Sequence, residues 1–485
     1  MRLGGALRRS AAACLAVFAL CLAAAGPAGA ANEDFFGVNA QAVFDMPSST
    51  WDNHLAAMSR GGLQLVRRDA SWVWAEPNPP DPVTGAHTYA WASFDQKVAA
   101  YARHGLRWLP TIDYSTGWSG QVPGDLFTPP ARTSDFTSYA AALARRYGRG
   151  GTFWRAHPEL PQLPVTRYEV WNEPNVSLFW HPQGGAPERY ADLYLATRAA
   201  LKAVDPAARV IVGGLALANA SVTPQDEFVE RMYAHRPDLK GKVDAVGFHP
   251  YVGTVDGVYR TLREFRRTLK DVGAETVPLE ITELGWTTTA TSDADRGAML
   301  ARLAEELPRS DCRITSLTPH TWVTYERDAS NPEHWFGIAN ADGTPKPSGN
   351  AYLGAVSKMR RSGTASASIR ICGSGTAADR RSGSRARGPH LRLRVRRARR
   401  HRRWVIASLR CPAGCRVRLE LLAPGRAAGT SGRAAARGSL RFSKRRRRVV
   451  LRARGRRRVL ELHVRARGRS GGLTKRVRRL RLRRR

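Results

Sequence analysis

Two glutamates, each at the end of a short apolar segment, are the residues of this chain best suited to do chemistry. The segment YEVWNEPNVSLFW (168–180) turns polar at Asn172 and Glu173, and the segment PLEITELGW (278–286) delivers Glu283. If both segments are parallel strands of one barrel, their ends meet at one face. Glycoside hydrolysis needs two carboxyl groups that face one sugar-binding site, one as acid and the other as nucleophile or base.

The neighbours of Glu173 fit the role of an acid. A proton donor near neutral pH needs a raised pKa, which apolar surroundings supply. Trp171, Phe179 and Trp180 provide aromatic cover in the sequence, and Asn172 carries an amide that can hydrogen-bond a sugar hydroxyl beside the scissile bond. We therefore expect Glu173 to be catalytic and Asn172 to bind substrate.

Glu283 must be ionised in order to attack. Arg67, which the pattern LQLVRRDASWVW places at the end of a second strand, can keep the pKa of Glu283 low. Glu283 shares strand parity with Leu279 and Ile281, so it is expected to point inward. Glu280 has the opposite parity and is expected to face a helix.

Further side chains follow other predicted strands. His249 can donate to a sugar hydroxyl, and Tyr251 can orient the nucleophile carboxylate; the alternative is a packed histidine and tyrosine without contact to substrate. Trp322 closes the last predicted strand and is expected to form an apolar floor under the sugar, with Trp286 and Trp335 as alternatives at the rim. No metal-ligand cluster is visible, and we predict neither a metal nor a cofactor.

The elements that must position these residues alternate along the middle of the chain. Short β-rich runs are predicted as strands at 35–40, 63–68, 106–113, 167–172, 209–213, 243–249, 279–283 and 313–323. Helices are expected between them, among them 187–204, 347–359 and one that places Val258, Leu262, Phe265 and Leu269 at steps of four and three. This alternation predicts a (β/α)8 TIM barrel. A doubly wound sheet is the rival, but no glycine-rich phosphate turn follows the first strand.

The order of these motifs resembles a known group of enzymes. YEVWNEPN followed late by ITELGW is similar to the glycoside hydrolases of clan A, most of all family 39, with family 5 as the near relation. VRRDASWVWAEP, GFHPY and GIANADGTPKPSGNAY resemble its second-strand, sixth-strand and final segments, so that the resemblance covers residues 35–357. It implies that Glu173 is the acid and base and that Glu283 is the nucleophile. Family 5 members usually carry a histidine near the end of the third strand, whereas this chain has Asp113 and Tyr114, which favours family 39.

Residues and resemblance together predict a retaining O-glycosyl hydrolase that cleaves an oligo- or polysaccharide, with a β-bond expected. A β-xylosidase, another β-glycosidase and an endo-glycanase all remain open. The alternative is a catalytically weak protein of the cell wall that binds carbohydrate or polyanions. The intact glutamate pair argues against this alternative for the barrel.

The positive charge lies in the last part of the chain. The formal net charge is +38, yet residues 31–356 carry 31 basic and 37 acidic residues. Residues 388–485 carry 36 Lys and Arg against only Glu420 and Glu461. This tail can bind an anionic cell-wall polymer, in which case salt would weaken binding; the alternative is a solvated basic face. Specific nucleic-acid recognition is not expected.

Four segments follow from these patterns. Residues 1–30 have the basic start, apolar stretch and small-residue end of a signal peptide, so we expect a secreted, extracellular or wall-associated protein that is not transmembrane after cleavage; a retained anchor is the alternative. Residues 31–360 are expected to form the catalytic barrel, and residues 361–388 are expected to form a linker rich in Gly, Ser and Arg. In 389–485 apolar and basic residues alternate, which predicts a small β-sandwich.

Four cysteines remain after the signal peptide, and an even number in an exported protein suggests disulfides. Cys411 and Cys415 flank Pro-Ala-Gly and are the expected pair, so that Cys312 and Cys372 pair by elimination. A zinc site at the close pair is the alternative, although only His401 is near in sequence.

Overall fold

The structure is a computed structural model of the chain. It describes residues 34–217, 222–362 and 368–373, together with the backbone of strands between residues 392 and 481. The predicted signal peptide and most of the predicted linker lie outside the described residues. Within the described residues, no helix combines the length and apolar character needed to cross a bilayer.

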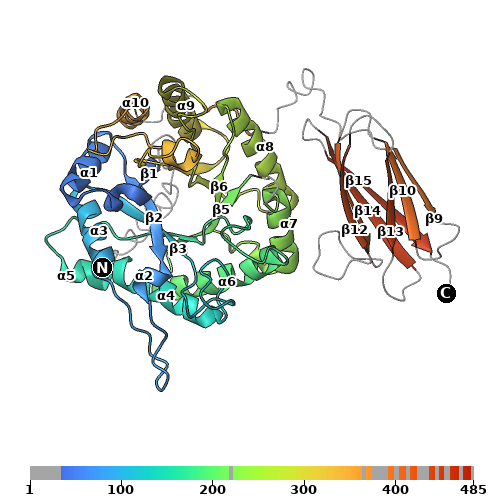
Figure 1. Cartoon of the computed structure of the whole chain (residues 1–485), viewed down its shortest axis with the longest axis horizontal. Coiled ribbons are helices and arrows are strands. Elements are labelled where there is room, and N and C mark those ends of the chain that lie inside the picture. Colours follow the sequence, from blue (N-terminus) through green and yellow to red (C-terminus); the bar gives the residue numbers. More distant parts are fainter. Residues whose placement is uncertain are drawn as a thin grey trace, which may run out of the picture.

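Eight parallel strands form one sheet in the order in which they occur along the chain (Figure 1). They are β1 (Gly37–Asn39), β2 (Leu65–Ser71), β3 (Arg107–Asp113), β4 (Arg167–Val170), β5 (Arg209–Ala216), β6 (Ala245–His249), β7 (Leu279–Ile281) and β8 (Ile314–Leu317). The sheet closes on itself, because Phe36 and Leu317 form a parallel bridge and the Leu317 N–H donates to the Phe35 carbonyl oxygen at 2.8 Å. The predicted (β/α)8 TIM barrel is therefore confirmed.

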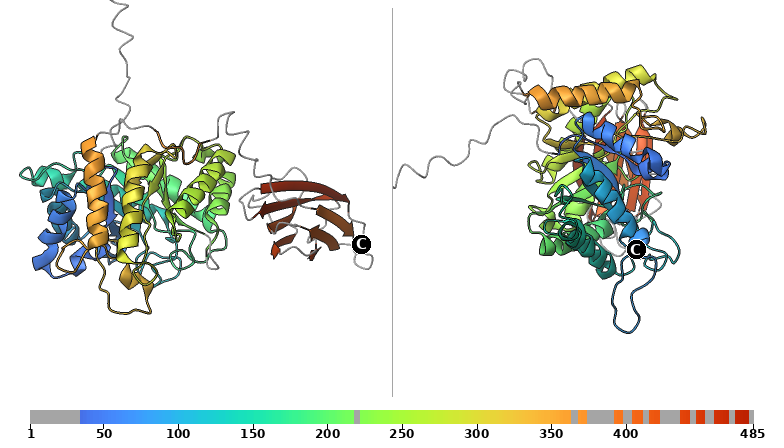
Figure 2. Two further views of the ribbon diagram at one scale, coloured as in Figure 1. Left: turned by 90° about the horizontal axis from the view of Figure 1, so that it is seen from above. Right: turned by 90° about the vertical axis from the view of Figure 1, so that its left-hand side faces the viewer.

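Helices surround the strands as an outer ring (Figure 1). The α-helices are α1 (Trp51–Arg60), α2 (Trp72–Ala75), α3 (Ala92–Arg103), α4 (Thr133–Tyr147), α5 (Thr152–Ala156), α6 (Ala186–Val204), α7 (Gln225–His235), α8 (Val255–Asp271), α9 (Asp293–Glu306) and α10 (Pro347–Ser362). Short 3-10 turns are η1 (Gln41–Asp45), η2 (Ser48–Thr50), η3 (Pro237–Leu239), η4 (Leu307–Arg309) and η5 (Pro332–Trp335). Helices α9 and α10 pack side by side (Figure 2).

Helix α8 shows why these segments are helical. Thr254 caps its start by accepting a hydrogen bond from the Gly257 N–H, and Gly273, with a φ of +75°, follows its end. The helix buries one apolar stripe against the barrel, as its spacing predicts: Val258, Leu262, Phe265 and Leu269.

Strand ends differ from the predictions in ways that matter for the site. β2 continues to Ser71, so Arg67 lies inside the strand rather than at its end, and β7 stops at Ile281, before Glu283. The prediction that Glu280 faces a helix is wrong. Its carboxylate accepts from Arg167 of β4 at 3.3 Å and from the Ser316 hydroxyl of β8 at 3.0 Å, and only the barrel interior is reachable from both strands.

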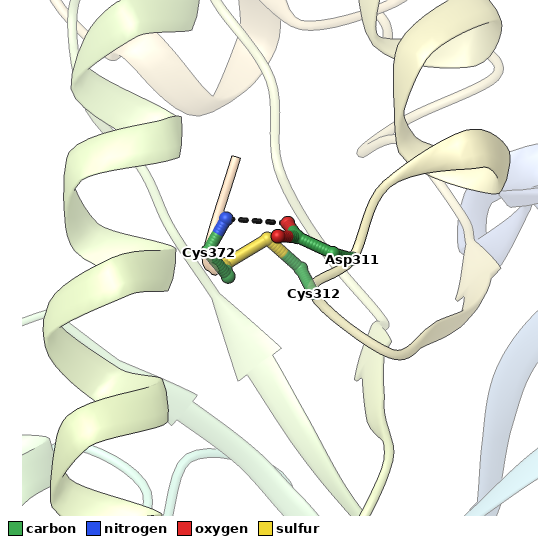
Figure 3. Close-up of side chains that lie close together, drawn as sticks. All are labelled: Asp311, Cys312 and Cys372. Atoms are coloured by element: carbon green, nitrogen blue, oxygen red, sulfur yellow. Dashed lines mark hydrogen bonds between the residues drawn. A yellow bond between two sulfur atoms is a disulfide. The ribbon is translucent and has the colours of Figure 1, made fainter. Parts of the chain in front are cut away.

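Cys312, just before β8, meets Cys372 of the segment 368–373 (Figure 3). Their sulfur atoms lie at bonding distance. The Asp311 carboxylate accepts from the backbone N–H groups of Ile371 and Cys372 at 2.8 and 2.6 Å. These contacts hold the segment at the start of β8, away from the strand end where the glutamates lie. Cys411 is outside the described residues, so its pairing stays a prediction.

The tail is described by itself, as backbone strands. They are β9 (Arg392–Arg397), β10 (Trp404–Arg410), β11 (Cys415–Leu422), β12 (Ala436–Phe442), β13 (Arg447–Arg452), β14 (Val459–Gly468) and β15 (Leu473–Arg481). They pair antiparallel in two sheets, β13-β10-β9 and β12-β11-β14-β15. The sandwich itself stays a prediction.

Candidate active site

The two candidate glutamates lie at the same rim of the barrel. Glu173 follows β4 and Glu283 follows β7, and the carboxyl ends of parallel strands share one face. A carboxylate oxygen of Glu173, one of Glu283 and a ring nitrogen of His249 all lie within 4.8 Å of one another. The barrel thus brings together two acids that are far apart in the sequence.

The backbone turns sharply where β4 ends. Trp171 and Glu173 have φ values of +66° and +44°. Residues other than glycine rarely adopt such positive values, and each costs about 1–3 kcal/mol of strain. The Trp171 indole N–H donates to the Phe179 carbonyl oxygen at 2.7 Å, and its ring packs on Trp180 with centroids 5.0 Å apart. The aromatic residues expected to cover Glu173 therefore hold the turn that presents it.

His249, the last residue of β6, is fully buried beside both acids. Its Nδ1 lies 2.8 Å from Glu173 Oε1 and 3.8 Å from Glu283 Oε2, and its Nε2 lies 3.0 Å from the Thr282 hydroxyl oxygen. The expected contact between His249 and a sugar hydroxyl does not fit this arrangement, because protein groups already face both ring nitrogens. The structure makes His249 a partner of Glu173.

Glu283 is surrounded by donors. Arg67 Nη1 donates to its Oε1 at 2.6 Å, the Tyr251 hydroxyl donates to its Oε2 at 2.8 Å, and Asn39 Nδ2 lies 3.4 Å from its Oε1. Burial raises the pKa of Glu283, but the nearby His249 and Arg67 outweigh burial and bring the pKa down to about 2. The carboxyl group is therefore ionised at neutral pH, and Arg67 and Tyr251 both donate to the carboxylate that they were predicted to contact.

Arg67 is the centre of this network. Its Nε donates to Glu169 Oε2 at 2.6 Å, and its Nη2 donates to Asn172 Oδ1 at 3.0 Å. Glu169 is fully buried and also accepts from the hydroxyls of Thr111 at 3.1 Å and Thr282 at 2.9 Å. Burial lowers the pKa of Arg67, but the facing carboxylates raise it more, so the guanidinium stays charged. The contact with Arg67 occupies the amide oxygen of Asn172, whose side chain also hydrogen-bonds Tyr114, so contact of Asn172 with a sugar stays a prediction.

His320 and Asn39 contribute to the site without having been predicted. His320 Nδ1 lies 3.8 Å from Glu283 Oε2, and His320 Nε2 lies 3.6 Å from Glu333 Oε2. Burial lowers the pKa of His320, but the bond to Glu333 and the charge of Glu283 raise it above its ordinary value. His320 follows β8 and Asn39 is the last residue of β1, and this position was the only signal in the sequence.

Trp322 does not lie where it was expected. Its ring is fully buried, which leaves no face for a sugar, and its Nε1 donates to His54 Nδ1 at 3.0 Å. The prediction that Trp322 forms an apolar floor under the sugar is therefore wrong. The reason is that β8 ends at Leu317, so that Trp322 lies in the chain beyond the strand and packs into the core.

Two more acids lie on β2 and β3, next to the network. Asp69 and Asp113 have the same strand parity as Arg67 and Thr111, which face the barrel interior. The Ser71 hydroxyl donates to Asp113 Oδ1 at 2.9 Å, while Oδ2 of this fully buried residue has no hydrogen-bond partner among the described residues. Burial, together with the charge of Asp69, raises the pKa of Asp113 well above its usual range. Asp113 is thus suited to donate or accept a hydrogen bond as a neutral acid.

Glu173, His249 and Glu283 are also close enough to hold a metal ion. However, the oxygens of Glu283 already accept from Arg67 and Tyr251. A second cation beside the Arg67 guanidinium would be repelled, so the donor set fits acid–base chemistry better than metal binding.

Comparison with known proteins gives one curated relative. No protein-family model matches the chain. The β-xylosidase of Geobacillus stearothermophilus is 24% identical over 262 residues, which amount to 48% of this chain and 47% of that protein. The chain therefore spans about half the length of the curated relative that it matches.

Solved structures extend the likeness. A family 39 β-xylosidase from Caulobacter crescentus is 18% identical, with a TM-score of 0.51 over 88% of this chain and 95% of that chain. A monomeric β-xylosidase from Caulobacter crescentus CB15 is 16% identical, with a TM-score of 0.50 and the same coverage of both chains. At these identities the structures establish a shared fold, and the curated relative adds a similarity in sequence.

Proposed function

The chain resembles the family 39 glycoside hydrolases of clan A in sequence and fold, and from that premise we propose that it is a retaining glycoside hydrolase acting on β-glycosides. The observation that carries the proposal is the approach of Glu173 and Glu283 oxygens to within 4.8 Å. Retaining enzymes hold their two carboxyl groups about 5–5.5 Å apart, whereas inverting enzymes need about 6.5–9.5 Å to admit a water. The spacing supports double displacement.

In the first step Glu173 gives its proton to the glycosidic oxygen while Glu283 attacks the anomeric carbon. The bond from that carbon to the leaving oxygen breaks, and an ester bond to the Glu283 carboxylate forms. Arg67 and Tyr251 support this step, because their hydrogen bonds keep Glu283 ionised and fix its direction.

In the second step the Glu173 carboxylate takes a proton from water. The water oxygen attacks the anomeric carbon, and the bond to Glu283 breaks. Two inversions leave the sugar with its original configuration, and both glutamates return to their starting states.

The substrate side of the proposal rests on the relatives. Each relative described above is a β-xylosidase, so xylosides are the first candidates. A screen of aryl β-glycosides alongside polysaccharides would identify the sugar and separate exo from endo action.

The test of the roles uses azide and an activated aryl β-glycoside. Glu283→Ala should lose hydrolysis and yield an α-glycosyl azide, because azide takes the place of the nucleophile. Glu173→Ala should still form the glycosyl-enzyme and yield a β-glycosyl azide, because azide attacks that intermediate. The unchanged enzyme with azide serves as control. The same azide configuration from both variants, or none from either, would refute the assignment.

Export and wall attachment are further parts of the proposal. They rest on the signal-like residues 1–30, on the Cys312–Cys372 pair at bonding distance and on the basic tail. If the tail binds an anionic polymer, the full chain should be retained by it at low salt and released at high salt, and a chain ending at residue 373 should not be retained. Equal behaviour of both chains would leave the tail as a solvated face.

A further inference from the structure

The hydrogen-bond partners of His249 determine which of its ring nitrogens carries the proton. Nδ1 lies 2.8 Å from Glu173 Oε1, and Nε2 lies 3.0 Å from the Thr282 hydroxyl oxygen. A neutral imidazole donates from one nitrogen and accepts at the other. The direction of the Thr282 bond therefore decides what His249 can offer to Glu173.

Thr282 has only one hydroxyl proton, and it is donated in a hydrogen bond to Glu169. The hydroxyl lies 2.9 Å from Glu169 Oε1, and Glu169 also accepts from Arg67 Nε at 2.6 Å and from the Gly214 N–H at 2.8 Å. A carboxylate that pairs with a guanidinium can only accept. The lone pair of Thr282 is thus left for His249, whose Nε2 must carry the hydrogen.

We infer that Thr282 is a positioning residue that fixes the tautomer of His249, so that Glu173 and His249 share one proton between Oε1 and Nδ1. This inference rests on the proposed function, because Glu173 is taken as the acid. With Nε2 protonated, the ring of His249 is cationic while the shared proton is on Nδ1, and this charge acts on Glu283. While the shared proton is on Glu173, the ring is neutral and presents a bare Nδ1 to Glu173. A bare Nδ1 accepts from a protonated Glu173 but repels its carboxylate.

Loss of the shared proton is therefore costly, since two lone pairs would face each other at hydrogen-bond distance. The shared proton supplies the acid for the first step. After Glu173 has given up its proton, the same repulsion makes its carboxylate a stronger base toward water in the second step. One fixed tautomer thus serves both halves of the reaction.

Other charged groups also face the pair. Glu283 Oε2 lies 3.8 Å from His249 Nδ1, and the negative charge of Glu283 favours retention of the proton. Arg67 bonds Glu283 and opposes retention, as does His320 when it is charged, at 3.8 Å from Glu283. These groups, together with the Tyr251 phenol and Glu169, remain in place when Thr282 is changed. A Thr282 variant therefore measures the effect of the His249 tautomer separately from the effect of the surrounding charges.

Thr282→Val keeps the shape of the side chain and removes the hydroxyl. His249 can then place its proton on Nδ1 and donate to the Glu173 carboxylate, so the shared proton is lost at lower pH. With a phenyl β-glycoside, whose leaving group needs an acid, the basic limb of kcat/KM should move down by about one pH unit. This shift corresponds to the free energy that one hydrogen bond contributes. With a 2,4-dinitrophenyl β-glycoside, which needs no acid, the basic limb should stay in place.

Two matched variants separate this role from a merely structural one. Thr282→Ser keeps a hydroxyl and should keep the limb of the parent enzyme. Thr111→Val removes the other hydroxyl from Glu169 without touching His249, and it should lower thermal stability without moving the limb. An unmoved limb in Thr282→Val, or an equal movement in Thr111→Val, would overturn the inference.

If Thr282→Val does not fold, nitrogen-15 NMR of the histidine rings in the parent enzyme gives the answer, with His249→Asn used to assign the signal. A neutral ring with hydrogen on Nε2 supports the inference, and hydrogen on Nδ1 refutes it. Failure of the azide test would instead refute the proposed function, because that test does not depend on the tautomer.

Discussion

Tyr251→Phe tests how the site keeps its nucleophile ionised. The Tyr251 hydroxyl donates to Glu283 Oε2 at 2.8 Å, and the substitution removes this bond without changing the ring. A hydrogen bond to a charged group contributes about 1.5–3 kcal/mol, which corresponds to about 1–2 pKa units. Burial, His249, Arg67 and His320 all act on this carboxyl group more strongly than Tyr251, so we expect the lower end of that range.

The pKa of Glu283 should therefore rise from about 2 by roughly one unit. The acid limb of kcat/KM should move upward by the same amount, while Glu283 stays ionised at neutral pH. An activated aryl β-glycoside is the right substrate, since its cleavage does not depend on the proton of Glu173. Rates would be measured from pH 2.5 to 7, and each sample would be assayed again at pH 6 to exclude unfolding.

The same shift affects stability with a defined sign. The pKa of folded Glu283 is depressed, so its ionised form contributes stability that is present above the ordinary carboxyl pKa and is lost as pH falls toward about 2. Tyr251→Phe should thus lower the melting temperature most at neutral pH, and its difference from the parent should narrow in acid.

Tyr352→Phe is the matched control. Tyr352 is also fully buried, and its hydroxyl donates to the Gly37 carbonyl oxygen at 2.8 Å. This variant should lose stability without moving the acid limb. If the acid limb of Tyr251→Phe coincides with that of the parent, Tyr251 does not set the ionisation of Glu283 and our account of the site fails.

Two other predictions follow from packing and from covalent structure. Gly214→Ala would place a Cβ 1.9 Å from His249 Nε2, and a displacement of about 1 Å in a catalytic group can lower kcat about 100-fold. The control is Gly354→Ala on α10, where a Cβ would meet nothing within 4 Å. Equal activity of the two variants would contradict the prediction. Cys312 and Cys372 are 60 residues apart, and reduction of this pair should lower the free energy of unfolding by about 2–4 kcal/mol. The value of kcat at 25 °C should not change, because the pair lies at the start of β8. Calorimetry with and without reductant measures the melting temperature, and an unchanged value would show that the bond does not form.

The sequence determined the barrel and the two glutamates. Alternating β-rich and amphipathic segments predict a (β/α)8 fold, because each pattern has its own period and each must bury an apolar face. A polar residue directly after a buried strand can only lie at the rim, so Glu173 and Glu283 were found from local pattern. Arg67 and Tyr251 were predicted along with them, because the charge of Arg67, the hydroxyl of Tyr251 and their positions on or after predicted strands suited contact with Glu283.

Only the tertiary structure decided what each side chain meets. Parity predicted an inward Glu283 and an outward Glu280, yet β7 ends at Ile281 and the Glu280 carboxylate lies inside the barrel. Parity holds only while the strand continues, and the sequence does not mark its last residue. For the same reason Trp322 was expected to lie under the sugar but is buried beyond β8.

The hydrogen bond between Thr282 and His249 shows most clearly what the sequence alone could not predict. Nothing in the local sequence distinguishes Thr282 from an ordinary strand residue. Its role arises because closure of the barrel brings β4, β6 and β7 together, so that one hydroxyl lies between Glu169 and His249. The local pattern of a chain specifies which groups reach the rim, whereas the direction of each hydrogen bond depends on partners that only the closed fold supplies.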